Sequence, residues 1–151
     1  MVIDIALQDY QNQIKTKKQD GKTFIFDPVR KTWLVLLPEE LVRQLMLQFL
    51  VDSMGYKWSH FRTESGLKVN EQRRRTDIIA YDQSVQPYLL VECKAPHIKI
   101  NENTFWQSVH YNRELQAPFL VVTNGIRTYC CEMDYTQEEG NFLAAIPRAP
   151  F

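Results

Sequence analysis

Residues 89–96 read LLVECKAP, a run typical of a buried strand that nevertheless carries a glutamate and a lysine two residues apart. Side chains of a strand alternate between its two faces. Alternation predicts one apolar face, formed by every second residue from Leu89 to Ala95. The opposite face carries Glu92 and Lys94. We interpret the first face as core and the second as a place where a carboxylate and an ammonium group point the same way.

The preceding segment supplies a partner for this strand. RTDIIAYD (75–82) reads as a strand, and the short turn QSVQ separates it from PYLLVECKA (87–95). Two strands so close in sequence predict an antiparallel hairpin. Its register would bring Asp77 roughly opposite Glu92 and Lys94, so that two carboxylates and a lysine meet at one end of a sheet.

Such a grouping suits a hard divalent cation. Mg²⁺ prefers oxygen ligands and is commonly held by one or two carboxylates together with substrate phosphate. We expect Asp77 and Glu92 to bind Mg²⁺ or Mn²⁺, with the backbone carbonyl of Cys93 as a further ligand. A bound metal lowers the pKa of a water and offsets phosphodiester charge, and Lys94 would orient or deprotonate that water. The alternative is a cross-strand ion pair between Asp77 and Lys94 that carries no chemistry.

The segment NENTFWQSVHYNRELQ (101–116) predicts a helix that follows the strand, with an Asn or Thr to cap it. Gln107 and Tyr111 are four residues apart and therefore share one helical face. The alternative is that Trp106, Tyr111 and Leu115 simply pack and that Gln107 makes only local contacts.

The rest of the chain predicts a sheet with helices on its faces. PEELVRQLMLQFLVDSMG (38–55) has helical spacing, with proline at its start and glycine at its end. We expect strands at 118–125 and 127–134, the first reached from the preceding helix by a crossover, and strand material at 60–70. The fold class is therefore α/β or mixed α+β, with a central mixed β-sheet flanked by helices. One domain is expected over 1–151, comprising an N-terminal arm (1–21), a hairpin (22–37) around a DPVR turn, and a core (38–134).

Composition narrows the class of protein. The 151 residues are 44% apolar and 12% aromatic, which is typical of one globular domain. With 18 basic and 18 acidic residues the net charge is zero, so composition alone does not indicate a nucleic-acid-binding protein. No apolar stretch is long enough to span a membrane and no secretory signal is visible, which favours the cytoplasm. An odd number of cysteines, with Cys130 and Cys131 adjacent and Cys93 far from both, argues against a disulfide framework. The absence of a CxxC pair and the scattered histidines argue against structural zinc.

The order and spacing of RRTD, LLVECK and QSVHY resemble the PD-(D/E)xK nuclease superfamily, whose RecB-like branch has a Q-x-x-x-Y helix. More closely, the chain resembles the N-terminal nuclease domains of type I restriction enzyme R subunits. The closer resemblance includes two further stretches, PEELVRQ (38–44) and VVTNG, and it covers about residues 30–130. It implies a restriction-endonuclease-like core and a metal-dependent endonuclease that hydrolyses DNA phosphodiester bonds in restriction-modification. DNA and translocase, specificity or methyltransferase subunits are the implied partners.

The resemblance implies a role for the residues of this sequence that match the acidic and lysine positions of the family motif. It implies that Asp77 and Glu92 are metal ligands and that Lys94 is the catalytic lysine. Glu40 matches the acidic residue that many such nucleases place on the first helix near the metal. Glu39 competes for that role, and helical geometry does not choose between them.

Substrate contacts are implied on either side of these acidic positions. Gln107 and Tyr111 match the nuclease helix, where they would support the site or contact DNA. Arg73 and Arg75 shortly precede the first metal ligand, and at least one is expected to reach a phosphate. Solvent exposure or pairing with acidic neighbours is the alternative for these arginines. Glu64 is a further candidate acid beside the metal ligands.

Two departures from the pattern keep other functions open. Thr76 stands where the superfamily name has proline, and the chain contains no GxxxxGK[ST] phosphate loop that would drive a translocase. A second hypothesis is therefore a non-catalytic nucleic-acid-binding or assembly module with a nuclease-like fold. A third is a structural domain in which the Asp, Glu and Lys form only an ion-pair cluster.

Overall fold

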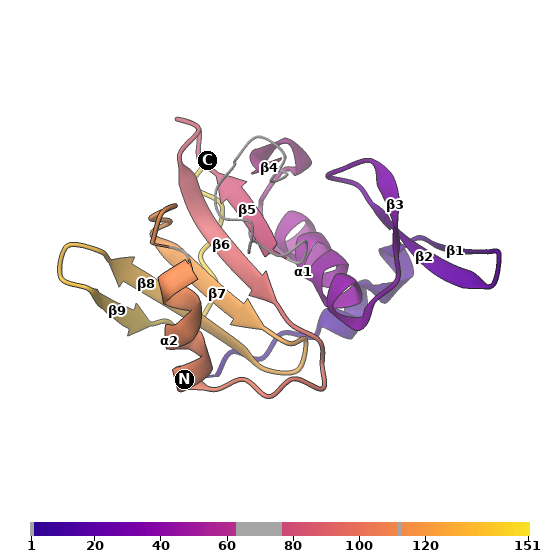
Figure 1. The fold of residues 1–151 in the computed structure, drawn as a ribbon. Coiled ribbons are helices and arrows are strands. Elements are labelled where there is room, and N and C mark those ends of the chain that lie inside the picture. Colours follow the sequence, from indigo (N-terminus) through magenta and orange to yellow (C-terminus); the bar gives the residue numbers. More distant parts are fainter. Residues whose placement is uncertain (1, 63–76, 112) are drawn as a thin grey trace.

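The structure, a computed structural model, describes residues 2–62, 77–111 and 113–151 (Figure 1). Its larger sheet has six described strands in the order β4-β5-β6-β7-β8-β9. Their bounds are Phe61–Arg62, Asp77–Tyr81, Pro87–Cys93, Phe119–Thr123, Thr128–Asp134 and Glu139–Phe142. Only β6 and β7 pair in parallel, and the other neighbours are antiparallel. The predicted fold class, a mixed sheet flanked by helices, is confirmed.

The hairpin of β5 and β6 has the predicted register. Asp77 is the pairing partner of Glu92, and Ile78 is the partner of Val91. The pairing shifts between Ala80 and Tyr81, next to the turn. The backbone thus brings Asp77 and Glu92 to the same level at one end of the sheet.

Helices cover both faces of this sheet. Leu89 and Val91 of β6 pack in one cluster with Met46 of α1 (Pro38–Met54). Leu90 packs in a second cluster with Phe105 of α2 (Glu102–Tyr111). The predicted alternation along β6 is confirmed, but the expectation of a single core face is wrong, because apolar residues from α2 and its neighbours bury the second face as well.

The helix α1 begins and ends where the sequence predicts. Pro38 is its first residue, and Gly55 follows its end with a φ of 82°, the left-handed conformation that glycine adopts without strain. Among the described helices, none has both the length and the apolar character needed to cross a membrane.

The connection from β6 to β7 is a crossover through α2, as predicted, because parallel neighbours cannot be joined by a tight turn. The helix is shorter than expected and ends at Tyr111 rather than at residue 116. Strand β9, Glu139–Phe142, was not predicted from the sequence; its alternating burial reflects pairing with β8 at the sheet edge. Of the range 60–70, where the sequence predicts strand material, the structure describes three residues: His60 ends the 3₁₀-helix η2 (Trp58–His60), and Phe61–Arg62 form β4.

A second, smaller sheet lies beside α1 (Figure 1). It consists of β1 (Thr16–Gln19), β2 (Lys22–Asp27) and β3 (Thr32–Val35), all antiparallel. The predicted hairpin around the DPVR turn is confirmed as β2 and β3. The segment expected to be an arm contains β1 and the 3₁₀-helix η1 (Leu7–Gln13), and Leu7 is buried in the core.

A buried ion pair attaches the small sheet to α1. Arg43 Nη1 lies 2.7 Å from Asp27 Oδ2, and both side chains are buried. The other oxygen of Asp27 accepts hydrogen bonds from the backbone N–H groups of Val29 and Arg30 in the turn. Desolvated charges are stable only when paired and hydrogen-bonded, so the two residues depend on each other.

Replacing Arg43 by methionine is expected to lower the free energy of unfolding by about 3–5 kcal/mol, because the buried Asp27 would lose its nearest and most buried cation. Urea denaturation followed by circular dichroism measures this change. Arg30→Met is the matched control, since Arg30 Nε lies 3.9 Å from the same carboxylate and is partly exposed. It should cost less than about 1 kcal/mol. Equal losses of unfolding free energy in the two variants would contradict the conclusion that Arg43 is the cation that stabilises buried Asp27.

Candidate functional site

The end of β6 carries a buried carboxylate beside a lysine. The Glu92 residue is 7% exposed, and Lys94 Nζ lies 3.8 Å from its Oε1 atom. The two side chains therefore lie close together, as the alternation along the strand predicts. The backbone N–H of Lys94 donates to the carbonyl oxygen of Thr123, so the lysine starts from a position held against β7.

A serine on α2 holds the other oxygen of this carboxylate. Ser108 Oγ donates a hydrogen bond to Glu92 Oε2, and the carbonyl oxygen of Thr104 is a second acceptor 3.3 Å away. Sequence reasoning missed Ser108, although it follows the buried Phe105 by three residues and therefore lies on the sheet-facing side of the helix. Gln107 is exposed. Tyr111 closes the helix, and its side chain lies outside the described part of the structure.

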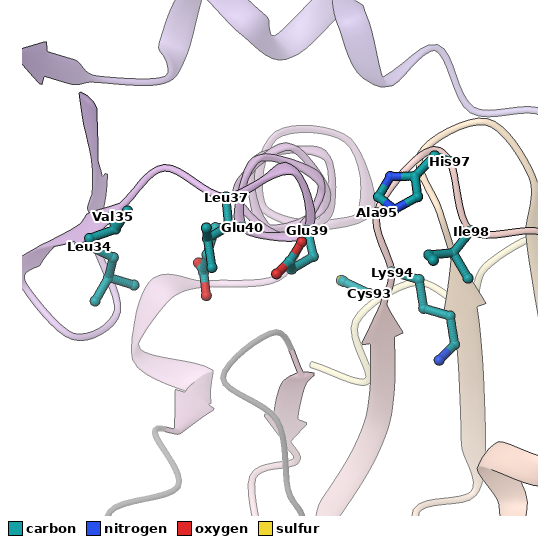
Figure 2. Close-up of a pocket in the computed structure, with 10 residues that line it drawn as sticks. All are labelled: Leu34, Val35, Leu37, Glu39, Glu40, Cys93, Lys94, Ala95, His97 and Ile98. Atoms are coloured by element: carbon teal, nitrogen blue, oxygen red, sulfur yellow. The ribbon is translucent and has the colours of Figure 1, made fainter. Parts of the chain in front are cut away.

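A cavity of about 650 Å³ opens at the same end of the sheet (Figure 2). The first turn of α1, the end of β3 with the residues that follow it, and the segment after β6 form its walls. Its lining includes Glu39, Glu40 and Lys94, together with Leu34, Val35, Leu37, Cys93, Ala95, His97 and Ile98. Both candidate helix acids and the candidate catalytic lysine therefore line one space.

Glu40 is an unusual group in this cavity. It is only 3% exposed, and neither of its carboxylate oxygens has a hydrogen-bond partner among the described residues. Arg43 Nη1 lies 3.6 Å from Oε2. Burial raises the pKa of Glu40, and the attraction of Arg43 offsets this only in part. A buried carboxylate with unbonded oxygens beside a cavity fits a cation, which would supply the missing partner.

The structure distributes the predicted residues over two neighbouring groups. Glu92 is held from the α2 side of the sheet, whereas Glu40 lies with Arg43 on the α1 side. Lys94 belongs to both groups, since it contacts Glu92 and lines the cavity. The Cys93 side chain is buried in the core on the α1 side, and its carbonyl as a metal ligand stays a prediction.

The remaining predicted residues are described only in part. Asp77 is placed by its backbone pairing with Glu92, and its side chain lies outside the described part. Arg73, Arg75 and Glu64 lie outside the described residues altogether. Within the described side chains, no group of three or more His, Cys, Asp and Glu residues is arranged to hold a metal ion.

Comparison with known proteins places most of the chain in a family. A model of the N terminus of the type I restriction enzyme R protein matches residues 38–147, which include both helices and β4 to β9. The chain belongs to this family. No curated protein and no solved structure matches it. The small sheet β1–β3 precedes the part matched to the R-protein N terminus, whereas Glu40, Glu92 and Lys94 all lie within it.

The raised pKa of Glu40 predicts a pH-dependent stability. Between the ordinary value of 4.5 and the raised value, the folded state binds more protons than the unfolded state, so stability falls as pH rises. In chelator at pH 7, Glu40→Gln should therefore raise the melting temperature, by roughly 2–4 °C for each kcal/mol relieved. The gain should shrink as the pH is lowered, because protonation of Glu40 then removes the same charge from the parent.

Glu39→Gln is the matched control for this measurement. Glu39 lies in the same helical turn but is only half-buried, so its substitution should change the melting temperature less. A gain for Glu40→Gln that is the same at every pH would contradict the role of its charge.

Proposed function

We propose that this chain is a divalent-metal-dependent endonuclease of the PD-(D/E)xK type that hydrolyses DNA phosphodiester bonds. The observation that carries the proposal is the pairing of Asp77 with Glu92, with Lys94 Nζ 3.8 Å from the glutamate. Two strands thus bring an acid, a second acid and a lysine to one sheet end in a member of the R-protein N-terminal family.

Asp77 and Glu92 would hold Mg²⁺ or Mn²⁺, with the carbonyl of Cys93 as a further oxygen ligand and Glu40 or Glu39 in support. When bound, a divalent cation lowers the pKa of its water and offsets the charge of the phosphate. Lys94 would orient the attacking water and donate a hydrogen bond to a phosphate oxygen as negative charge develops. Ser108 donates a hydrogen bond to one oxygen of Glu92 and so would limit the movement of this carboxylate as a ligand.

Further contacts would position the DNA. Arg73 or Arg75 would bind a phosphate next to the metal, and Gln107 and Tyr111 would support the site or contact the strand from α2. We infer that this domain works in the cytoplasm with a translocase, specificity or methyltransferase subunit. Its membership of the R-protein N-terminal family supports partners from a restriction system.

Nicking of supercoiled plasmid in Mg²⁺ or Mn²⁺ tests the proposal directly. Lys94→Ala and Glu92→Ala should each reduce cleavage about a hundredfold or more, because each removes a group that acts on the reacting phosphate. Lys99→Ala is the matched control, since this exposed lysine lies five residues from Lys94, outside the cavity lining. It should cleave like the parent.

A metal titration of the melting temperature separates binding from catalysis. The parent should gain stability with Mg²⁺ or Mn²⁺, and Glu92→Ala should lose that gain. A comparison of Glu39→Gln with Glu40→Gln identifies the helix acid, since only the supporting one should weaken the metal effect. If the parent neither cleaves nor gains stability with metal, the nuclease proposal fails and the non-catalytic module is favoured.

A further inference from the structure

The outer face of the small sheet concentrates aromatic side chains. Strand pairing places Phe24 between Lys17 and Val35, and places Trp33 opposite Phe26. Residues paired across antiparallel strands share a face, so these five side chains lie together. The other face is the one attached to α1, where Ile25 and Asp27 are buried.

This face is open although it is apolar. Trp33 is 36% exposed and Val35 is 47% exposed, while Phe24 and Phe26 are half-buried. Figure 1 shows the small sheet projecting on the α1 side of the molecule, with this end free of other described elements. An exposed patch of large apolar side chains is typical of a binding surface.

A lysine lies over the rings. Lys17 Nζ is 4.6 Å from the centroid of the Trp33 ring and 6.0 Å from that of Phe24. Phe26 packs edge-on against Trp33 with centroids 5.3 Å apart. The face therefore combines flat aromatic surface with a cation, which is the combination that binds stacked bases and their phosphates.

The charge of the small sheet favours a polyanion. Residues 15–31 contain six of the chain's 18 basic residues and two of its 18 acidic residues, one of which is the buried Asp27. The chain as a whole is neutral. The positive charge is thus local to the sheet that carries the aromatic face, and it disfavours a basic or neutral protein partner.

We propose that the outer face of β1–β3 binds single-stranded DNA. Bases stack on Trp33 and its phenylalanine neighbours, and phosphates pair with Lys17 and the lysines around it. A duplex keeps its bases stacked on one another, so only a single strand offers ring faces to this platform. The inference rests on the proposed function, because it takes DNA as the substrate of the neighbouring site.

The face leads to the candidate catalytic lysine. Val35 belongs to the outer face and also lines the cavity, next to Leu34 and Leu37. Figure 2 shows these residues on the wall across α1 from Lys94. A strand bound on the face would thus continue toward the cavity, where Glu39, Glu40 and Lys94 lie. The surface would hold an unpaired strand next to the point of cleavage.

Binding of a fluorescent oligothymidine, followed by anisotropy in chelator, tests the inference without cleavage. Trp33→Leu should weaken binding about tenfold or more, because it removes a stacking ring but keeps apolar bulk, whereas Trp33→Phe should retain most of it. Lys17→Gln should weaken binding and make it less dependent on salt. Lys18→Gln is the matched control, since Lys18 is the next residue and lies on the opposite face with the same charge.

Several outcomes would overturn the inference. If Lys17→Gln and Lys18→Gln lose the same amount of binding affinity, the contribution of Lys17 is only general electrostatic attraction and does not depend on the aromatic face. Tighter binding of a duplex of the same sequence, or an unchanged affinity in Trp33→Leu, would exclude a single-strand platform. If sedimentation shows that the parent is a dimer and that Trp33→Leu is a monomer, the face is an interface between two copies of the chain. Circular dichroism melting confirms that each variant is folded.

The cleavage assay keeps this inference distinct from the proposed function. Lys94→Ala should fail to nick plasmid, and adding Trp33→Leu to this inactive variant should still weaken oligothymidine binding about tenfold or more. If Trp33→Leu changes neither oligothymidine binding nor plasmid nicking, the single-strand surface fails and the nuclease proposal stands. A parent that binds the oligonucleotide through Trp33 but never nicks would retain the platform and sink the nuclease.

Discussion

Burial of β6 on both faces is the constraint on which the rest of the structure depends. A strand enclosed by α1 and α2 leaves little water to solvate a charge, so the stability of Glu92 depends on partners inside the protein. It finds them in the hydroxyl of Ser108 and the ammonium of Lys94. The short turn between β5 and β6 and their apolar pattern set the register that places Asp77 beside Glu92. The enclosure of β6 then decides which groups surround Glu92.

A second buried charge group connects the periphery to this end of the sheet. Asp27 binds Arg43, and Arg43 lies near Glu40, so that the small sheet and the first turn of α1 are held together. Arg43 is already engaged by a fully buried carboxylate, which leaves the oxygens of Glu40 without a hydrogen bond. Burial raises the pKa of Glu40 at the cavity, and the attraction of Arg43, which also binds Asp27, offsets this only in part. The network also orients the outer face of β1–β3 away from α1.

Local patterns predicted the elements that depend on neighbours in sequence. The alternation of LLVECK, the short turn before it and the helical spacing after Pro38 led to β5, β6 and α1 with nearly their observed bounds. They did not predict β9 or the burial of the second face of β6, because both depend on which distant segment packs there. The Q-x-x-x-Y motif singles out Gln107 and Tyr111, whereas Ser108 is identified only by its place on the buried face of the helix.

The sequence by itself determined the periodicity of the strands and helices, the pairing of Asp77 with Glu92, and the side-chain alternation that puts Lys94 with Glu92. These follow from backbone geometry over a few residues. Only the tertiary structure decided that Asp27 would meet Arg43, that Glu40 would be buried without a hydrogen bond, and that the aromatic side of the small sheet would face outward. These features arise where segments far apart in the chain come together. The packing of those segments decides whether a charge or an aromatic ring is buried or exposed to water.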